Sequence, residues 1–169
     1  MIELLPQIAG KWKEDREGVS GIGDQVVDET QKRLIAKLKG QVSEQTLEKA
    51  YRIYATTFDG EYGGFGDAPK FPTSHNLSFF LIRYYKKTGE THALNMVEKT
   101  LDSMNRGGMY DHIGFGFARY STDGQWLVPH FEKMLYDNAL LAMTYVEAYQ
   151  VTGKKEVRRR GGANLYLRA

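Results

Sequence analysis

Two of the four histidines lie with several carboxylates in one glycine-rich stretch, residues 107–139. Asp111 and His112 are adjacent, and His130 and Asp137 are seven residues apart. A histidine held by a carboxylate acts as a general base near neutral pH. A spacing of seven brings two side chains to within about 20° of each other on an α-helix. These four residues are therefore candidate catalytic residues.

A structural role for each of them remains open. A lone Asp-His pair is more simply explained by a loop histidine, His112, bonded to a backbone carbonyl. His130 is better placed as a base, because a helix is predicted to begin there and a helix N-terminus disfavours the imidazolium ion. Asp137 and Asn138 interrupt an otherwise apolar helix, where unpaired burial is costly. They either bind the backbone of the 107–128 loop or face a polar ligand.

Six further side chains are candidates for binding a polar ligand. Two of them belong to the loop at residues 58–72, where they could complete a polar ring, although a surface turn explains them equally well. An exposed tryptophan could stack on the C–H face of a sugar, although packing within the loop is the commoner use of aromatic residues. A glutamate in a first helical turn is favoured by the helix dipole alone. The six are Asp67, Lys70, Arg119, Trp126, Glu132 and Asn138.

Composition and spacing exclude several other chemistries. The chain contains no cysteine, which excludes thiol catalysis, disulfides and cysteine-ligated metals. The histidines lack the spacing of a zinc site, and the glycines match neither a dinucleotide motif nor a P-loop. We expect no cofactor and no metal. The net charge of +2 depends on arginines at the very end of the chain, so nothing indicates nucleic acid.

The sequence carries no sign of export or membrane insertion. No apolar run approaches the length of a membrane span, and the N-terminus lacks the basic and apolar regions of a signal peptide. We therefore expect a cytoplasmic protein with no membrane partner. Its 169 residues suffice for one ordinary domain.

The elements that must position these residues are helices arranged in a repeat. After residue 40 a pattern of outer helix, loop and inner helix occurs twice, with helices predicted at 43–57, 74–87, 91–105 and 130–151. The first and third are amphipathic, which is typical of an outer layer. The second and fourth are apolar nearly all round, which suits an inner layer. Glycines follow the ends of these helices and explain why they stop.

Three other regions depart from this repeat. Between residues 112 and 128 the helical period fails, which predicts a short β-hairpin or a compact loop. At the N-terminus a helix at 3–17 is predicted to end at the glycines of 18–23, and a second helix to run from Asp24 to about residue 39. The tail at 158–169 fits neither pattern, and its composition favours a non-native addition over a truncated domain.

A resemblance to a known family is carried by two segments, FDGEYGGFGDAPKFP (58–72) and GGMYDHIGFGFARYSTDGQWLVPHFEKMLYDNA (107–139). Over roughly residues 1–157 the chain resembles thioredoxin-domain-containing proteins of the YyaL or spermatogenesis-associated type. The resemblance implies a thioredoxin-like domain followed by an (α/α)6 toroid similar to N-acylglucosamine 2-epimerases and six-hairpin glycosidases. Residues 1–39 would then be the last helix of the thioredoxin-like domain with a linker, and residues 40–157 about two of six toroid hairpins.

The resemblance implies an all-α partial toroid and, by analogy alone, a carbohydrate-processing activity. Sugar epimerases with this fold use histidines to move a proton at carbon. The alternative is a non-catalytic scaffold for the thioredoxin-like domain. Expected partners are a carbohydrate-like small molecule, that domain and the rest of the toroid. A third of a toroid leaves apolar helix faces open, so we also expect self-association and no complete enzyme.

Overall fold

The structure is a computed structural model that describes residues 4–34, 43–155 and 157. The chain divides into two units, Met1–Val42 and Ser43–Ala169. The expectation for the tail at 158–169 lies outside the described residues. The assignment of residues 1–39 to a thioredoxin-like domain and linker stays a prediction.

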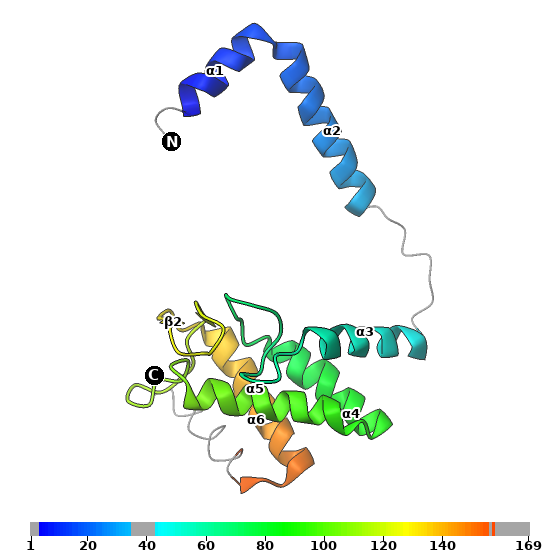
Figure 1. Ribbon diagram of the computed structural model, residues 1–169, viewed down its shortest axis with the longest axis vertical. Helices are drawn as coiled ribbons and strands as arrows, with labels where there is room; N and C mark the ends of the chain where they lie inside the picture. Colours follow the sequence, from blue (N-terminus) through cyan, green and yellow to red (C-terminus); the bar gives the residue numbers. More distant parts are fainter. Residues whose placement is uncertain (1–3, 35–42, 156, 158–169) are drawn as a thin grey trace. The chain divides into compact units, whose positions relative to one another are not determined.

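The N-terminal unit consists of two helices, α1 (Leu4–Glu14) and α2 (Arg16–Leu34), drawn in blue in Figure 1. The predicted break at residues 18–23 is wrong, because α2 continues through these glycines. The chain turns at Asp15 instead, whose carboxylate accepts a hydrogen bond from the Gly18 backbone N–H at 3.0 Å and so caps α2. Neither helix has a buried residue, so the described part of this unit, residues 4–34, has no core of its own.

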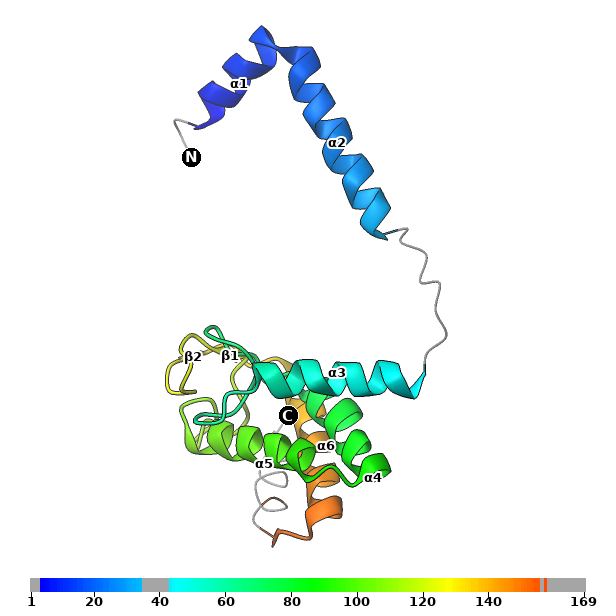
Figure 2. The ribbon, with the colours of Figure 1, turned by 45° about the vertical axis from the view of Figure 1, so that its right-hand side comes forward.

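The C-terminal unit contains the helical hairpins. Its helices are α3 (Glu44–Thr57), η1 (Asn76–Ile82) continuing into α4 (Arg83–Thr88), α5 (Thr91–Arg106) and α6 (Leu135–Thr152). The segment η1 has π-helical hydrogen bonding and packs against both α5 and α6. In Figures 1 and 2 the loops gather at one end of these helices, where α3 ends and α6 begins. Among the described helices, none is both long enough and apolar enough to cross a membrane.

The packing of α5 follows its sequence pattern. Ala93, Val97, Leu101 and Met104 recur at helical spacing, and each is at most 2% exposed, as predicted for the inward face. Burial of each larger side chain contributes about 1.5–3 kcal/mol. The Tyr145 hydroxyl on α6 donates a hydrogen bond to the Leu101 carbonyl at 2.7 Å. This contact fixes α6 against α5.

Glycine follows three of the helices as predicted, at Gly89, Gly107 and Gly153. Gly89 and Gly153 are left-handed, with φ of 76° and 68°, and each donates its backbone N–H to the carbonyl four residues earlier. The helix α3 ends at Thr57 as predicted, but Phe58 follows it, and the Gly63–Gly64 pair lies further along the chain. Those two glycines serve the loop that follows.

The predicted β-hairpin is confirmed, but it extends further along the chain. Strand β1 (Tyr120–Ser121) pairs antiparallel with β2 (Pro129–His130). The prediction that the second inner helix begins at residue 130 is therefore wrong, since α6 begins at Leu135. The Arg119 backbone N–H also donates to the Glu132 carbonyl at 2.8 Å. Pro129 would favour a helix that begins directly after it, but this non-local pairing holds the segment as a strand instead.

Candidate functional site

A hollow lies where the two inner helices begin. Phe71 to His75 line it from the segment that leads into η1, and Asp137 lines it from the first turn of α6. We call it the rim hollow. Burial raises the pKa of the Asp137 carboxyl, while the charges of Arg119 and His75 act in the opposite direction. No group in the described part of the chain donates a hydrogen bond to this carboxylate.

Thr73 contributes two unusual features to the rim hollow. Its φ is 41°, a left-handed conformation that is rare for a β-branched residue. Its hydroxyl is buried and has no hydrogen-bond partner among the described residues. Strained backbone and unpaired buried polar groups both concentrate at functional sites. The rim hollow therefore combines an unbonded carboxylate, an unbonded hydroxyl and local strain.

His130, the first predicted catalytic residue, does not lie on a helix and does not line the rim hollow. It lies in β2, is exposed, and stacks on Tyr120 with ring centroids 4.8 Å apart. Tyr120 stacks in turn on Phe71 at 4.9 Å. The prediction that His130 and Asp137 share a helix face is wrong, because His130 precedes α6. The helix-dipole argument for a neutral His130 is lost for the same reason.

Asp111 and His112 do not act as a pair. Asp111 accepts a hydrogen bond from Lys133 Nζ at 2.6 Å and two more from backbone N–H groups of its own turn. These bonds hold the pKa of Asp111 well below its usual range. The exposed His112 packs edge-on against Tyr110, with centroids 5.0 Å apart. Asp111 thus stabilises its loop rather than activating a histidine.

Arg119 and Glu132 form a half-exposed ion pair at 2.9 Å. Hydrogen bonding and charge from Glu132 raise the pKa of the Arg119 guanidinium. The prediction that Glu132 sits in a first helical turn is wrong, because it belongs to the extended segment before α6. Arg119 keeps an electrostatic influence on the site, since its charge acts on Asp137.

Asn138 is 2% exposed and anchors the 107–128 loop. Its Oδ1 accepts from the Phe117 N–H at 2.6 Å, and its Nδ2 donates to the carbonyls of Phe117 and Met134 at 3.0 Å each. Backbone groups therefore occupy both ends of this amide. The anchoring interpretation holds for Asn138, and the ligand-binding one does not.

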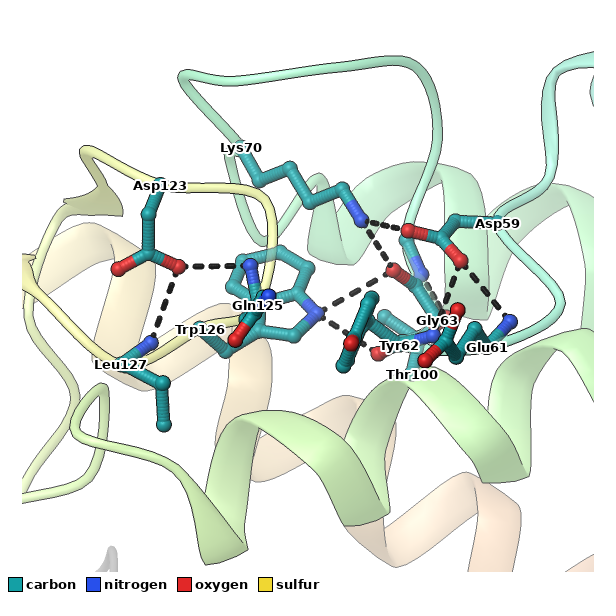
Figure 3. A network of polar contacts seen from close by, with 11 residues as sticks. Asp59, Glu61, Tyr62, Gly63, Lys70, Thr100, Asp123, Gln125, Trp126 and Leu127 are labelled. Carbon is teal, nitrogen blue, oxygen red and sulfur yellow. Dashed lines mark hydrogen bonds and ion pairs between the residues drawn. The ribbon is translucent and has the colours of Figure 1, made fainter.

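Lys70 and Trp126 belong to a buried network beneath the loops (Figure 3). Lys70 is 1% exposed, and its Nζ donates to the Asp59 carboxylate and to the Gly63 carbonyl, the latter at 3.0 Å. The fully buried Trp126 donates from Nε1 to the same carbonyl at 3.2 Å and to that of Tyr62 at 2.9 Å. Trp126 thus fills the core, which excludes it as a sugar platform, and Lys70 is engaged in the same network.

Asp67 lines a different hollow, between the 58–72 loop and residues 123–128. Asp123, on the opposite wall, accepts hydrogen bonds from the backbone N–H groups of Gln125 and Leu127 at 2.6 and 3.2 Å. The predicted polar ring of Asp67 and Lys70 with the other candidates therefore does not form. Within the described ranges, no group of three or more His, Asp or Glu side chains is arranged to hold a metal.

The site also contains residues to which the sequence assigned no role. Thr73, Ser74 and His75 line the rim hollow with Asp137. A signal for His75 existed, because it follows Pro72 closely at the start of the first inner helix. The repeat assigned the corresponding position to His130 in the second copy, but β2 displaces that residue.

No family model matches the sequence. An uncharacterized protein of Caenorhabditis elegans is 39% identical over 158 residues, covering 90% of this chain and 21% of the relative. Human spermatogenesis-associated protein 20 is 37% identical over 161 residues, which cover 89% of this chain and 20% of the human protein. This chain is homologous to one segment of spermatogenesis-associated protein 20. The resemblance drawn from the sequence is confirmed, and the chain spans about a fifth of the length of these relatives.

Two solved structures share the fold. A sugar epimerase from a ruminal bacterium matches with a TM-score of 0.57 at 22% identity, over 73% of this chain and 37% of the epimerase. Cellobiose 2-epimerase from Bacillus thermoamylovorans matches with a TM-score of 0.59 at 16% identity, over 74% of this chain and 37% of the epimerase. The likeness concerns the fold alone at such identities. It confirms the predicted fold class of helical hairpins, as found in these toroid epimerases.

Proposed function

We propose that this chain contributes one wall of a carbohydrate-binding site in a longer toroid protein, and that the rim hollow is that wall. The observation that carries the proposal is the Asp137 carboxylate, which lines the rim hollow without a hydrogen-bond partner among the described residues, together with the buried Thr73 hydroxyl, which also lacks one. Sugar hydroxyl groups donate and accept hydrogen bonds, so they satisfy both. The fold shared with two sugar epimerases supports the same ligand class.

Each residue of the hollow has a role in this proposal. Asp137 accepts hydrogen bonds from ligand hydroxyl groups, and Thr73 donates one. The exposed His75 is the proton-transferring base. Phe71, which is 47% exposed, offers its ring to the C–H face of a sugar. Arg119 limits the rise in the pKa of Asp137 and keeps its carboxylate available.

The spacing of charges on α6 favours proton transfer over glycoside hydrolysis. Asp137 and Glu147 are the only charged residues of this helix. Ten residues separate them by about 15 Å along the helix axis. Two carboxylates that cleave a glycosidic bond lie about 5–10 Å apart. The reaction class we propose for the longer protein is therefore proton abstraction at a sugar carbon, as in an epimerase, and this chain alone binds without turnover. A cytoplasmic location stays a prediction.

Calorimetric titration with glucose, mannose, N-acetylglucosamine and N-acetylmannosamine tests the site. We expect at least one sugar to bind, and we expect Asp137→Asn and Thr73→Val each to weaken it about tenfold, because each loses one hydrogen bond to the ligand. Asp67→Asn is the matched control, since it removes the same charge from the other hollow. An inert panel, or equal affinities for all variants, would refute the proposal.

A scaffold role is the alternative, and exposed apolar loop residues favour it. Ile113 is 93% exposed and Phe131 is 85% exposed, both at the loop end of the helices. A thioredoxin-like domain of the longer protein would cover such side chains. In that case Ile113→Ser with Phe131→Ser would abolish binding to a separately produced thioredoxin-like domain, and no sugar would bind. Binding of a sugar that depends on Asp137 would rule this alternative out as the sole function.

A further inference from the structure

The rim hollow continues into a second hollow along the inner helices. The two share Ser74 and His75, so they adjoin without an intervening residue. We call the second one the inner-wall hollow. The residues that complete its lining come from both inner helices: Ser78 and Arg83 on one side, and Leu140, Met143, Thr144 and Glu147 on the other.

We propose that the inner-wall hollow binds a second unit of an oligosaccharide whose first unit occupies the rim hollow. This inference rests on the proposed function and deepens it, because it makes the ligand an oligosaccharide rather than a single sugar. Each hollow receives one of the two charged residues of α6, Asp137 in the rim hollow and Glu147 in the inner-wall hollow. Both charged residues of this largely apolar helix therefore lie in the two adjoining hollows.

The chemistry of the inner-wall hollow suits a neutral polyhydroxy ligand. Glu147 accepts a hydrogen bond from the Ser78 hydroxyl, and this bond orients its carboxylate across the hollow. Arg83 supplies the opposite charge on the other helix, so neither sign of ligand charge is favoured. Leu140 and Met143 are 39% and 59% exposed and offer apolar surface for C–H groups. Alternating hydroxyl and C–H surface is what a sugar presents.

The test compares a monosaccharide with a disaccharide on the full chain. Glucose and cellobiose, and mannose and mannobiose, are titrated by calorimetry against the wild type and Glu147→Gln. The variant keeps the size of the side chain and an oxygen for Ser78 but removes the charge. We expect each disaccharide that binds to do so about tenfold more tightly than its monosaccharide. Glu147→Gln should remove most of this difference and leave monosaccharide affinity unchanged.

Control variants and melting curves separate the outcomes. Glu98→Gln is the matched control, because Glu98 pairs with Lys154 at 2.6 Å and lines neither hollow. Equal affinity for both members of each sugar pair would overturn the second subsite and leave the proposed function standing. Failure of every sugar to bind a folded wild type would overturn both. A loss of monosaccharide binding in a folded Glu147→Gln variant would also count against separate subsites.

Discussion

The carboxylate of Asp137 lowers stability at neutral pH. Because burial raises its pKa in the folded protein, the folded state holds its proton more tightly than the unfolded state does. Stability attributable to this group therefore falls as pH rises through the raised folded pKa. It is regained as pH falls towards the unfolded value of about 4. Asp137 thus reduces stability and has no hydrogen-bond partner among the described residues. Both properties are more typical of a residue that binds a ligand than of one that stabilises the fold.

We predict that Asp137→Asn raises the melting temperature at pH 7 by up to about 3 °C. The gain should shrink as the pH is lowered and disappear near pH 4, where the carboxyl of the wild type is protonated. Differential scanning calorimetry between pH 4 and 7 measures the effect, with Asp67→Asn as the exposed control. A lower melting temperature at pH 7 would show that the Asp137 carboxylate stabilises the fold.

The ion pair between Lys70 and Asp59 stabilises the fold, and its dependence on pH is opposite to that of Asp137. Burial acts to raise the pKa of Asp59, but hydrogen bonds from Lys70 and two backbone N–H groups outweigh it and lower the pKa. The stability that this carboxylate contributes is complete above its unfolded pKa, and it is lost as pH falls through the lower folded value. Lys70 joins the 58–72 loop to β1 as well, since its backbone N–H donates to the Ser121 carbonyl at 2.9 Å.

We predict that Lys70→Met lowers the free energy of unfolding by about 3 kcal/mol, because it leaves the Asp59 carboxylate and the Gly63 carbonyl without their cation. Asp59→Asn should then lower the free energy of unfolding less in the Lys70→Met variant than in the wild type, with a coupling energy of about 1–3 kcal/mol. Urea denaturation of the four proteins measures this cycle. Lys99→Met, on the exposed side of α5, should change stability by less than about 0.5 kcal/mol. Additive losses at Lys70 and Asp59 would contradict the buried pair.

Among elements, the two loops depend on a close approach between Gly64 and Trp126. A Cβ atom added at Gly64 would lie 2.5 Å from Cζ2 of the indole, and the residue has a φ of 83°. Hydrogen bonds from Nε1 hold the ring in place, so it cannot withdraw. The loop that follows α3 is thus shaped around a tryptophan more than sixty residues away in the sequence.

We predict that Gly64→Ala costs about 2–5 kcal/mol, the sum of left-handed strain and overpacking. Gly66→Ala separates these two effects. Gly66 has a φ of 70°, but nothing lies within 4 Å of the added Cβ. It should therefore cost only about 1–2 kcal/mol. Equal losses by urea denaturation would mean that the contact with Trp126 is unimportant.

The elements differ in how well the sequence predicts them, and the difference is physical. The buried face of α5 was predictable because Val97, Leu101 and their neighbours repeat at a local helical spacing. The start of α6 was not, because Pro129 and His130 are held extended by strand partners that lie eight and ten residues earlier in the chain. The Lys70–Asp59 contact was equally hidden, since loop geometry rather than spacing brings the two together. At the candidate site the sequence predicted Asp137, but not the hollow that Thr73 and His75 complete.

At the scale of the whole molecule, α6 is apolar on two sides. Leu141 and Tyr145 pack into the core, while Leu135 and Val146 are 78% and 41% exposed. In the sugar epimerases that share the fold, the matched region is 37% of the chain, so nearly two thirds of each epimerase lies outside it. An inner helix of a longer toroid would have a neighbour on this side. We propose that in the isolated chain a second copy covers this face, as is usual for a large exposed apolar patch.

We predict concentration-dependent self-association of the 169-residue chain, measured by light scattering after size exclusion. Val146→Glu should shift the chain to monomer, because a charge at the centre of the contact would be buried unpaired. Val146 lines neither hollow, so sugar binding should survive in this variant. Ile53→Glu is the matched control, since Ile53 is 55% exposed on α3 and receives the same charge. A monomeric wild type with a cooperative melt would contradict the proposal, and so would an equal effect of the two substitutions.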